Sequence, residues 1–358
     1  MTQQMKVGLA LSGGGAIGAY QVGVVKALAE SGTQIHAVAG ASIGALNGAI
    51  VASSPSLTQA AARLAEVWEH LGANSPLMAN KSVYIKLLAQ AAFAFGQTNA
   101  LSRAVQLVAT LASKANVLPD GLSELADDAL LSDQPLVQLM ERYLDTVALA
   151  NGLPLYVSLY PTQGGLVDIL SCLRAEFGLG ETAKSVFRHI QSMPIETQKE
   201  ALLASAALPL LFKARSIDGV RYSDGGMGGW STMQGNTPVT PLVEAGCNLI
   251  VVTHLSDGSM WDRHAFPDTT IMEIRPRSTL RRHGGTLGGA KDLLGFTASH
   301  VNSWIAQGYE DTLATVARIQ APLQARQALR DSYDTLALSQ AQDQAADDAL
   351  ATAMARIK

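Results

Sequence analysis

Apolar and polar positions alternate in blocks along the first 55 residues, and these blocks predict an α/β order of elements. The apolar run 6–11 is typical of a short buried strand, and a helical pattern follows in which Tyr20 and Leu28 share one face. A second strand is predicted at 35–39, and a helix of small residues continues to about residue 52. Strand, turn and helix in this repeated order indicate a parallel α/β sheet.

The rest of the chain extends this pattern without an internal repeat or a long Pro- or Ser-rich linker. From residue 56 to about 150 the pattern is mostly helical. Later strands are predicted at 155–159, 166–170, 214–217, 248–253 and 270–274, and helices at 197–207 and 297–319. The last 40 residues are rich in Ala, Gln and Asp and helical in composition. One decorated domain is favoured over two.

Composition excludes several classes of protein. Only 16% of residues are charged, 48% are apolar, and 26 basic against 30 acidic side chains give a net charge of −4. This balance argues against a disordered chain and gives no general sign of nucleic-acid binding. Two cysteines, Cys172 and Cys247, are too few for a disulfide framework or a four-thiolate zinc site.

No segment predicts export through a signal peptide or a bilayer-spanning helix. The first residues lack the charged, apolar and small-residue regions of a secretory signal in that order. No stretch of 18 or more residues is apolar and uncharged enough to cross a bilayer. We therefore expect a cytoplasmic protein, and export by a route that leaves no signal stays open.

A candidate nucleophile lies at the end of the second predicted strand, in Gly40-Ala41-Ser42-Ile43-Gly44. A serine on such a sharp strand-to-helix turn is exposed, and the turn needs small neighbours such as Gly40 and Gly44. The following helix directs its N-terminal amides at the site, which favours developing negative charge. The simpler interpretation, an ordinary glycine-bounded turn, stays open for this motif taken alone.

A run of three glycines, Gly13, Gly14 and Gly15, ends the first predicted strand. With Gly18 it fits the dinucleotide fingerprint, but that site needs an acidic residue about 20 positions later, and 33–38 contains none. The other interpretation is an oxyanion hole for a serine on the neighbouring strand. We prefer the oxyanion hole because the next strand ends at Ser42.

A serine nucleophile needs a base, and none of the seven histidines lies in a setting that singles it out. Among the later acidic residues, Asp224 stands out because two glycines follow it and a hairpin-like segment, 217–222, precedes it. A plain turn is the alternative interpretation of this segment. If Asp224 serves Ser42, only the fold can bring them together.

Together these blocks resemble the patatin-like phospholipases in order and approximate spacing. The similar segments are 13–18, 40–44, 204–212, 224–226, 236–239 and 246–252. The resemblance implies a three-layer α/β/α sandwich with a mixed, mostly parallel sheet and a helical insertion at about 56–150. It implies an acyl hydrolase domain over 1–320 and leaves 321–358 as a C-terminal helical extension.

The resemblance also implies a Ser–Asp dyad without histidine. Ser42 would attack an ester carbonyl, Asp224 would act as its base, and the backbone of 13–15 would bind the oxyanion without a metal or other cofactor. Aspartate is a weak base at its ordinary pKa of about 3.9, so the site must desolvate it or stabilise the alkoxide.

Two departures from the family pattern affect the surroundings of the dyad. Ile17 stands where the family usually has Arg or Lys, so a cation near the oxyanion hole is missing or comes from elsewhere. Nine residues, 227–235, separate the aspartate-glycine block from the Asn-x-Pro element, where the family has about three. This longer loop, which contains Trp230, either shapes the acyl pocket or is a surface insertion.

Charged residues gather outside the catalytic blocks. Residues 81–118 are basic, apolar-rich and free of Asp and Glu, which is typical of a membrane-interface element and equally of packed helices with a solvated basic edge. Arg275, Arg277, Arg281 and Arg282 suit a phospholipid headgroup, with a solvated loop as the alternative.

We thus expect a lipid acyl hydrolase of the phospholipase A or lysophospholipase type that works through an acyl-enzyme on Ser42. Its expected partner is a phospholipid or lysophospholipid, with peripheral membrane contact through 81–118 and no nucleic acid. Two alternatives stay open: a serine acyltransferase or thioesterase, and a non-catalytic lipid-binding module.

Overall fold

The computed structural model describes residues 5–74, 134–209, 212–283, 292 and 295–356. The chain divides into two compact units, Met1–Thr312 and Leu313–Lys358. The first unit holds the sheet and its covering helices. The second consists of the remainder of one long helix.

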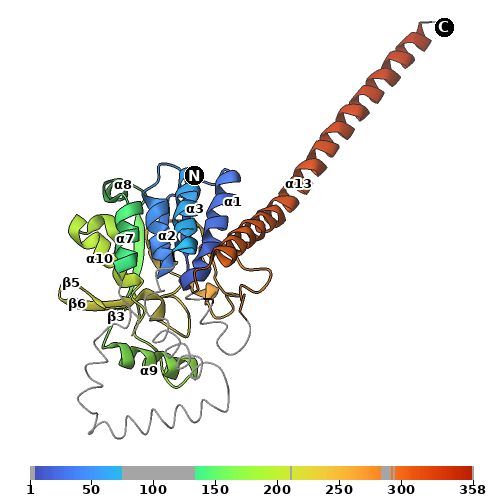
Figure 1. Cartoon of the computed structure of the whole chain (residues 1–358). Coiled ribbons are helices and arrows are strands. Elements are labelled where there is room, and N and C mark those ends of the chain that lie inside the picture. Colours follow the sequence, from blue (N-terminus) through green and yellow to red (C-terminus); the bar gives the residue numbers. More distant parts are fainter. Residues whose placement is uncertain (1–4, 75–133, 210–211, 284–291, 293–294, 357–358) are drawn as a thin grey trace, which may run out of the picture. The chain divides into compact units, whose positions relative to one another are not determined.

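Eight strands form one sheet in the first unit (Figure 1). They are β1 (Val7–Leu11), β2 (Ala37–Gly40), β3 (Leu155–Pro161), β4 (Val186–His189), β5 (Arg215–Ile217), β6 (Val220–Asp224), β7 (Leu249–Thr253) and β8 (Thr270–Ile274). Their order is β5-β6-β3-β2-β1-β7-β8, and β4 pairs with β3 off this path.

The sheet changes from parallel to antiparallel pairing at β3. Strands β3, β2, β1, β7 and β8 pair in parallel with their neighbours in this order. On its other edge β3 pairs antiparallel with β4 and β6, and β5 and β6 form an antiparallel hairpin. The predicted α/β class with a mixed, mostly parallel sheet is therefore confirmed.

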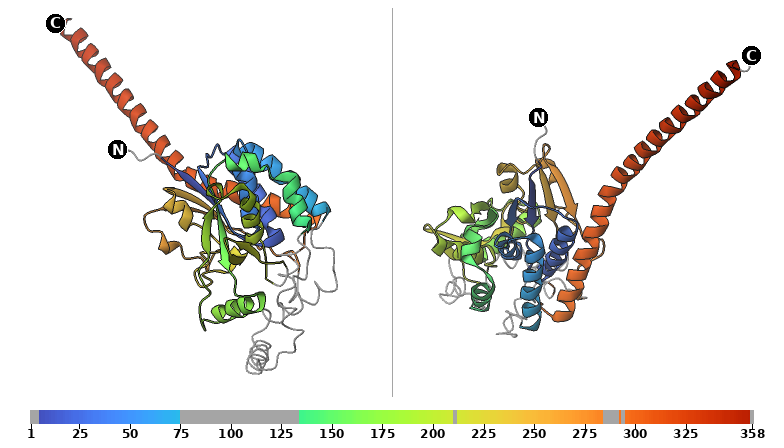
Figure 2. Two further views of the ribbon diagram at one scale, coloured as in Figure 1. Left: turned by 90° about the vertical axis from the view of Figure 1, so that its left-hand side faces the viewer. Right: turned by 90° about the horizontal axis from the view of Figure 1, so that it is seen from above.

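The described helices lie between and around these strands. They are α1 (Ala19–Glu30), α2 (Ile43–Ala52), α3 (Leu57–Ala73), α7 (Gln134–Tyr143), α8 (Thr146–Ala150), α9 (Gly165–Glu176), α10 (Ile195–Ser205), α11 (Thr240–Glu244) and α13 (Ala298–Ala355). Helices α1, α2 and α3 lie side by side along the sheet (Figures 1 and 2).

Alternating residues of the strands supply two hydrophobic cores, one on each face of the sheet. In β1, Leu9 packs into the core beneath α1, α2, α3 and α10, whereas Ala10 faces the opposite core. In β7, Val251 and Val252 divide in the same way. This period of two is the ordinary side-chain alternation of a strand. The second core is closed by residues of α11 and by Trp261.

The start of α13 packs closely against α1 within the first unit. A Cβ atom at Gly23 would lie 1.9 Å from the carbonyl oxygen of Ile305, and one at Gly308 would lie 2.0 Å from that of Tyr20. Only glycine permits this separation of the two backbones. The hydroxyl of Tyr20 donates a hydrogen bond to Asp311 over 3.1 Å.

Most elements predicted from the sequence are present, and one prediction was wrong. Residues 166–170 were expected to form a strand, but they belong to helix α9, Gly165–Glu176. Asp168 in its first turn accepts hydrogen bonds from the backbone of Gln163 at 3.1 Å and from the hydroxyl of Thr162, so it anchors the helix start. Much of the helical insertion, including 81–118, lies outside the described residues.

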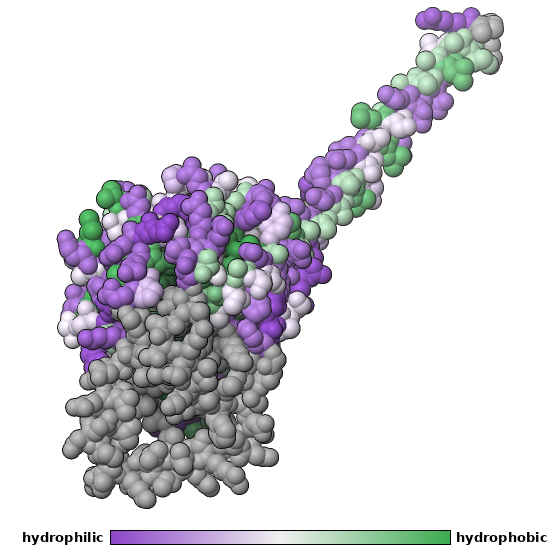
Figure 3. All heavy atoms as spheres, in the orientation of Figure 1, coloured by the Kyte–Doolittle hydropathy of each residue, from purple (hydrophilic) through white to green (hydrophobic). Residues whose placement is uncertain are grey.

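The second unit is helical over its described residues, and most of its side chains are exposed. Between residues 324 and 356 every residue is exposed. Apolar side chains such as Leu329, Tyr333 and Leu350 are interspersed with polar ones along it, as the alternating colours in Figure 3 show. Residues 321–355 are helical as part of α13, and their division from the acyl hydrolase domain stays a prediction.

Candidate active site

Ser42 lies at the sharp turn between β2 and α2, as the glycine-bounded motif predicted. It is the N-cap residue of α2, with φ 54° and ψ −126°, and is 7% exposed. A positive φ is costly for a residue with a side chain, and such strained residues gather at functional sites. The turn therefore holds a serine in the conformation expected of a nucleophile elbow.

The two flanking glycines are required by close contacts within the turn. A Cβ atom at Gly40 would lie 2.3 Å from the carbonyl oxygen of Gly44. One at Gly44 would lie 2.1 Å from the carbonyl oxygen of Leu11, at the end of β1. Both glycines are thus needed to bring the start of α2 against β1.

Asp224 ends strand β6 and lies in the interior beside Ser42. It is 3% exposed, and its Oδ1 accepts the amide hydrogen of Gly226 over 2.9 Å. Its Oδ2 is buried and has no hydrogen-bond partner of ordinary geometry among the described residues. Burial raises the pKa of Asp224 from 3.8 to about 6, and hydrogen bonds from Ser42 and Gly226 oppose that rise.

Strand β3 brings these two distant residues together, because β2 and β6 pair with its two edges. Gly40 is in register with Val157, and Asp224 is in register with Leu159. Ser42 and Asp224 therefore lie on either side of one strand. Because β6 runs antiparallel to β3, its last residue meets β3 at Leu159, two residues beyond Val157 and at the edge where β2 ends.

Two buried serines form a chain of hydrogen bonds between the two sides. The amide of Ser42 donates to Oγ of Ser205 over 3.0 Å, and that hydroxyl donates to the carbonyl oxygen of Ser158 over 2.8 Å. The hydroxyl of Ser158 donates to the carbonyl oxygen of Gly225 over 3.0 Å. Sequence reasoning missed both serines; the only signal was that Ser205 lies in a segment resembling the family.

The glycine run after β1 lies against the elbow. A Cβ atom at Gly13 would lie 3.0 Å from Cβ of Ser42, and one at Gly18 would lie 2.7 Å from Ile43. The amide of Gly13 already donates to the carbonyl oxygen of Asn236 over 3.2 Å. Gly14 and Gly15 follow at the start of a short 3₁₀ turn, Gly15–Gly18, where Gly15 has φ 57°.

Asn236 links this glycine run to the aspartate loop. A Cβ atom at either Gly13 or Gly226 would lie 2.6 Å from Oδ1 of Asn236. The nine-residue loop 227–235 therefore returns the chain to the site. Within it, the indole nitrogen of Trp230 donates to Glu176 of α9 over 2.7 Å.

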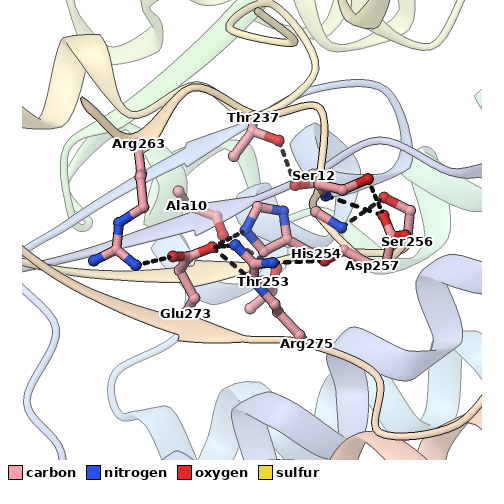
Figure 4. Close-up of polar contacts among 12 residues, drawn as sticks. Ala10, Ser12, Thr237, Thr253, His254, Ser256, Asp257, Arg263, Glu273 and Arg275 are labelled. Atoms are coloured by element: carbon pink, nitrogen blue, oxygen red, sulfur yellow. Dashed lines mark hydrogen bonds and ion pairs between the residues drawn. The ribbon is translucent and has the colours of Figure 1, made fainter. Parts of the chain in front are cut away.

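A polar network fixes the ends of β1 and β7 behind the glycine run (Figure 4). The amide of Ser12 donates to the carbonyl oxygen of Thr253 over 3.3 Å, and the Ser12 hydroxyl bonds with that of Thr237 at 2.9 Å. His254 follows Thr253 directly and is buried. Its Nε2 lies 3.0 Å from Oε2 of Glu273 in β8.

Glu273 is the centre of the charged part of this network. Arg263 contacts it at 3.2 Å, and Arg275 donates to it from Nε at 2.9 Å. Although burial opposes the effect, hydrogen bonds from His254 and Arg275 lower the pKa of Glu273 to about 2. Sequence reasoning missed this cluster because Glu273 lies 19 residues beyond His254, and only the β7–β8 pairing joins them.

An apolar cavity of about 60 Å³ opens beside the first turn of α2. Its wall includes Ile43, the residue after Ser42, and side chains of α2, α3 and α7, together with Phe296. Asn47, the one amide in the lining, directs its polar atoms to Gly18, Gln21 and Trp68 instead. The cavity therefore suits an aliphatic chain.

Two of the four arginines in 275–282 use their guanidinium groups in contacts within the protein, and the other two are exposed. The guanidinium of Arg275 contacts Glu273 and the carbonyl oxygen of Asp257, and that of Arg282 contacts Thr279, Ser303 and Gln307. Arg277 and Arg281 are exposed, so headgroup binding stays a prediction for these two. Ile17 is buried in the main core.

Among the described residues, no helical stretch combines the length and hydrophobicity that a bilayer-spanning segment requires. Both cysteines are free thiols and are buried. Burial raises the pKa of Cys172 to about 12. It is therefore a neutral packing residue near neutral pH.

Comparisons with solved structures and curated proteins give distant matches. VipD from Legionella pneumophila aligns over 88% of this chain and 67% of its own, with 14% identity and a TM-score of 0.38. The type III effector protein ExoU aligns over 88% and 53%, with 17% identity and a TM-score of 0.34.

Among curated proteins, Lysophospholipase nte1 of Aspergillus terreus is 61% identical over 46 residues, 13% of this chain and 3% of that protein. Neuropathy target esterase sws of Drosophila persimilis is 50% identical over 52 residues, 14% and 4% of the two chains. The matched segments are thus a small part of these much longer relatives.

A family model described as patatin-like phospholipase matches residues 9–243. This match extends over more than half of the chain and includes both Ser42 at the elbow and Asp224 at the end of β6. The chain therefore belongs to the patatin-like phospholipase family.

Proposed function

We propose that this protein is a lipid acyl hydrolase in which Ser42 and Asp224 form the catalytic dyad. The observation that carries the proposal is the pairing of a strained serine with a buried carboxyl group. Ser42 has φ 54°, and Asp224 has a pKa raised to about 6. A carboxylate with that pKa is a stronger base than an ordinary aspartate while still ionised at neutral pH.

The reaction proceeds in two halves. Ser42 Oγ attacks the ester carbonyl carbon while its proton passes to Asp224. The tetrahedral intermediate then collapses, the ester C–O bond breaks, and the alcohol leaves with the proton from Asp224. Water attacks the resulting acyl-enzyme with Asp224 again as base, which releases the fatty acid and restores the Ser42 hydroxyl.

The oxyanion is assigned to backbone amides of Gly14 and Gly15. Gly13 lies against Ser42, but its amide already donates to the carbonyl oxygen of Asn236. The two following glycines belong to the same loop, which lies along Ser42 and Ile43. Preorganised amides at such a position are worth about 3–4 kcal/mol of transition-state stabilisation each.

The cavity beside Ile43 is the proposed place for the acyl chain. Its apolar lining includes Ile43, the residue after Ser42, together with side chains of α2, α3 and α7, which supports this place. The names of the relatives support a phospholipid or lysophospholipid as substrate. Peripheral membrane contact through 81–118 stays part of this proposal and lies outside the described residues.

The test is fatty acid release from phosphatidylcholine and lysophosphatidylcholine vesicles. We expect Ser42→Ala and Asp224→Asn to lose activity by about a thousandfold or more, as for other essential members of catalytic sets. Ser192→Ala and Asp218→Asn, both at exposed positions, serve as controls and should keep full activity. Activity in the wild type should rise with pH through about 6, as Asp224 ionises.

The products of the same assay separate the alternatives. Free fatty acid supports hydrolysis, whereas acyl product on an added alcohol or thiol acceptor indicates a transferase. Labelling of Ser42 by a fluorophosphonate probe supports a catalytic serine. A folded protein that neither reacts with the probe nor releases fatty acid would be a non-catalytic lipid-binding module.

A further inference from the structure

Two histidines and one aspartate that the proposed hydrolysis does not use converge after the last strand. His283 follows β8, Asp292 lies beyond it in sequence, and His300 is in the first turn of α13. One potential ligand atom from each of the three lies within 4.8 Å of the others. Asp292 is fully buried, whereas the two histidines are partly exposed.

The contacts within this cluster leave ligand capacity unused. His283 Nδ1 lies 2.7 Å from Oδ1 of Asp292, and Oδ2 of Asp292 accepts the amide hydrogen of Arg282 over 3.0 Å. The His283 and His300 rings meet edge to face, with centroids 4.7 Å apart. His300 Nδ1 is buried and has no hydrogen-bond partner among the described residues.

A buried imidazole nitrogen without a partner costs free energy unless something binds it. We propose that His283, Asp292 and His300 form a binding site for a divalent transition metal, with Zn²⁺ as the fitting ion. Two imidazoles and one carboxylate are a donor set that suits Zn²⁺ and does not suit Mg²⁺ or Ca²⁺, which take oxygen ligands.

The geometry requires only a small adjustment. In a tetrahedral zinc site with bonds of about 2.0–2.2 Å, ligand atoms lie roughly 3.4 Å apart. A pair of ligand atoms 4.8 Å apart therefore has to close by about 1.4 Å, and the 2.7 Å pair of His283 Nδ1 and Asp292 Oδ1 has to open by about 0.7 Å. The three protein ligands leave one position for water. The ion would join the segment after β8 to the start of α13.

The test is zinc binding by the tag-free, full-length protein after chelator treatment, measured by calorimetry. We expect one Zn²⁺ per chain, a rise in the unfolding temperature with added Zn²⁺, and no comparable effect of Ca²⁺. Co²⁺ in its place should give the visible absorption of a tetrahedral nitrogen and oxygen site.

Variants assign the ligands. His283→Ala and His300→Gln should each weaken Zn²⁺ binding at least about a hundredfold, whereas His264→Ala, at an exposed histidine elsewhere, should not change it. His283 has an exposed edge, 32% for its side chain, so its replacement is the variant best suited to keep the fold. Circular dichroism verifies that each variant is folded.

Two results would overturn the proposal. One is a wild-type protein that binds no Zn²⁺ at stoichiometric concentration, which would make the cluster a hydrogen-bonded His–Asp pair. The other is folded His283→Ala that binds Zn²⁺ as tightly as the wild type. Because neither readout is catalytic, the outcome is independent of whether Ser42 hydrolyses lipids.

Discussion

The backbone conformation of Ser42 and the buried environment of Asp224 both disfavour the folded state. The backbone of Ser42 is strained at φ 54°, and the carboxyl of Asp224 is buried with one oxygen free of standard hydrogen bonds among the described residues. Strain of this kind costs about 1–3 kcal/mol, and a buried charge costs more unless it is compensated. Packing and hydrogen bonds in the rest of the first unit must therefore supply the free energy that holds Ser42 and Asp224 in this geometry.

Replacing the buried charge should stabilise the folded protein at high pH. Because burial raises the Asp224 pKa from 3.8 to about 6, its contribution to stability is greatest below pH 3.8 and is lost as pH rises through 6. Each pKa unit corresponds to 1.36 kcal/mol, so the rise from 3.8 to about 6 lowers the free energy of unfolding at high pH by about 3 kcal/mol. Asparagine is neutral throughout and keeps the bond from Gly226.

Thermal unfolding of Asp224→Asn at pH 4, 6 and 8 measures this effect. The variant should unfold at a higher temperature than the wild type at pH 8 and at nearly the same temperature at pH 4. Asp218→Asn, on the exposed turn of the same hairpin, should show no such trend. A stability difference for Asp224→Asn that does not change with pH would contradict the raised pKa.

Ser205 should affect turnover more than substrate binding. Its hydroxyl accepts the Ser42 amide and donates to Ser158, so Ser205→Ala leaves the elbow with an unsatisfied buried amide. We expect kcat to fall about tenfold with little change in KM, and Ser171→Ala in α9 to leave both unchanged. If Ser205→Ala changed KM and left kcat unaltered, Ser205 would only shape the substrate site.

Single residues were predicted from sequence where a motif constrains them locally. Ser42 became a candidate because Gly40 and Gly44 surround it, and Asp224 because two glycines follow it. Ser158, Ser205, His254 and Glu273 carry no local signature, and their roles depend on strand pairings far apart in sequence. Such contacts cannot be read from the spacing of residues along one chain.

At the scale of elements, strands next to glycine turns were the most predictable. The error at 166–170 arose because a short, mostly apolar run with Asp168 at its centre fits a strand and a buried helix equally well. The helix is decided by its surroundings, since Asp168 bonds to the loop before it. β4 was not predicted, and its place on β3 follows from tertiary pairing.

The cavity along α2 should set the preferred length of the acyl chain. Ala49 lines it, so Ala49→Leu fills part of its volume of about 60 Å³. We expect the ratio of kcat/KM for long over short acyl esters to fall at least about tenfold. Ala62→Leu, at an exposed position of α3, is the matched control and should leave the ratio unchanged.

The unfolding temperature of Ala49→Leu distinguishes the two ways in which it can act. A variant with normal stability and a shortened chain preference supports an acyl site. A variant that loses long and short esters equally, with lowered stability, indicates overpacking of the core, which typically costs about 1–3 kcal/mol. Equal losses without destabilisation would contradict the proposed place of the acyl chain.

On the scale of the whole molecule, the family match ends before the sheet does. It stops at residue 243, whereas β7 and β8 lie beyond it and β7 pairs with β1 along five residues. A chain cut after residue 243 therefore leaves one edge of β1 and the second core exposed. Family boundaries and folding boundaries differ in this protein.

Two truncations test this difference. A chain ending at residue 323 should unfold within a few degrees of the full-length protein, since every residue from 324 to 356 is exposed. A chain ending at residue 243 should lack a cooperative thermal transition. Cooperative unfolding of the shorter chain, or a strongly destabilised longer one, would contradict this division.

The placement of β3 between β2 and β6 also sets the order in which the site is completed during synthesis. Ser42 leaves the ribosome 182 residues before Asp224, roughly 10–40 s earlier at about 5–20 residues per second. Throughout that interval the nascent chain carries the proposed nucleophile without the proposed base. If Ser42 and Asp224 form the proposed dyad, chemistry on the Ser42 hydroxyl begins only when the antiparallel edge of β3 is occupied.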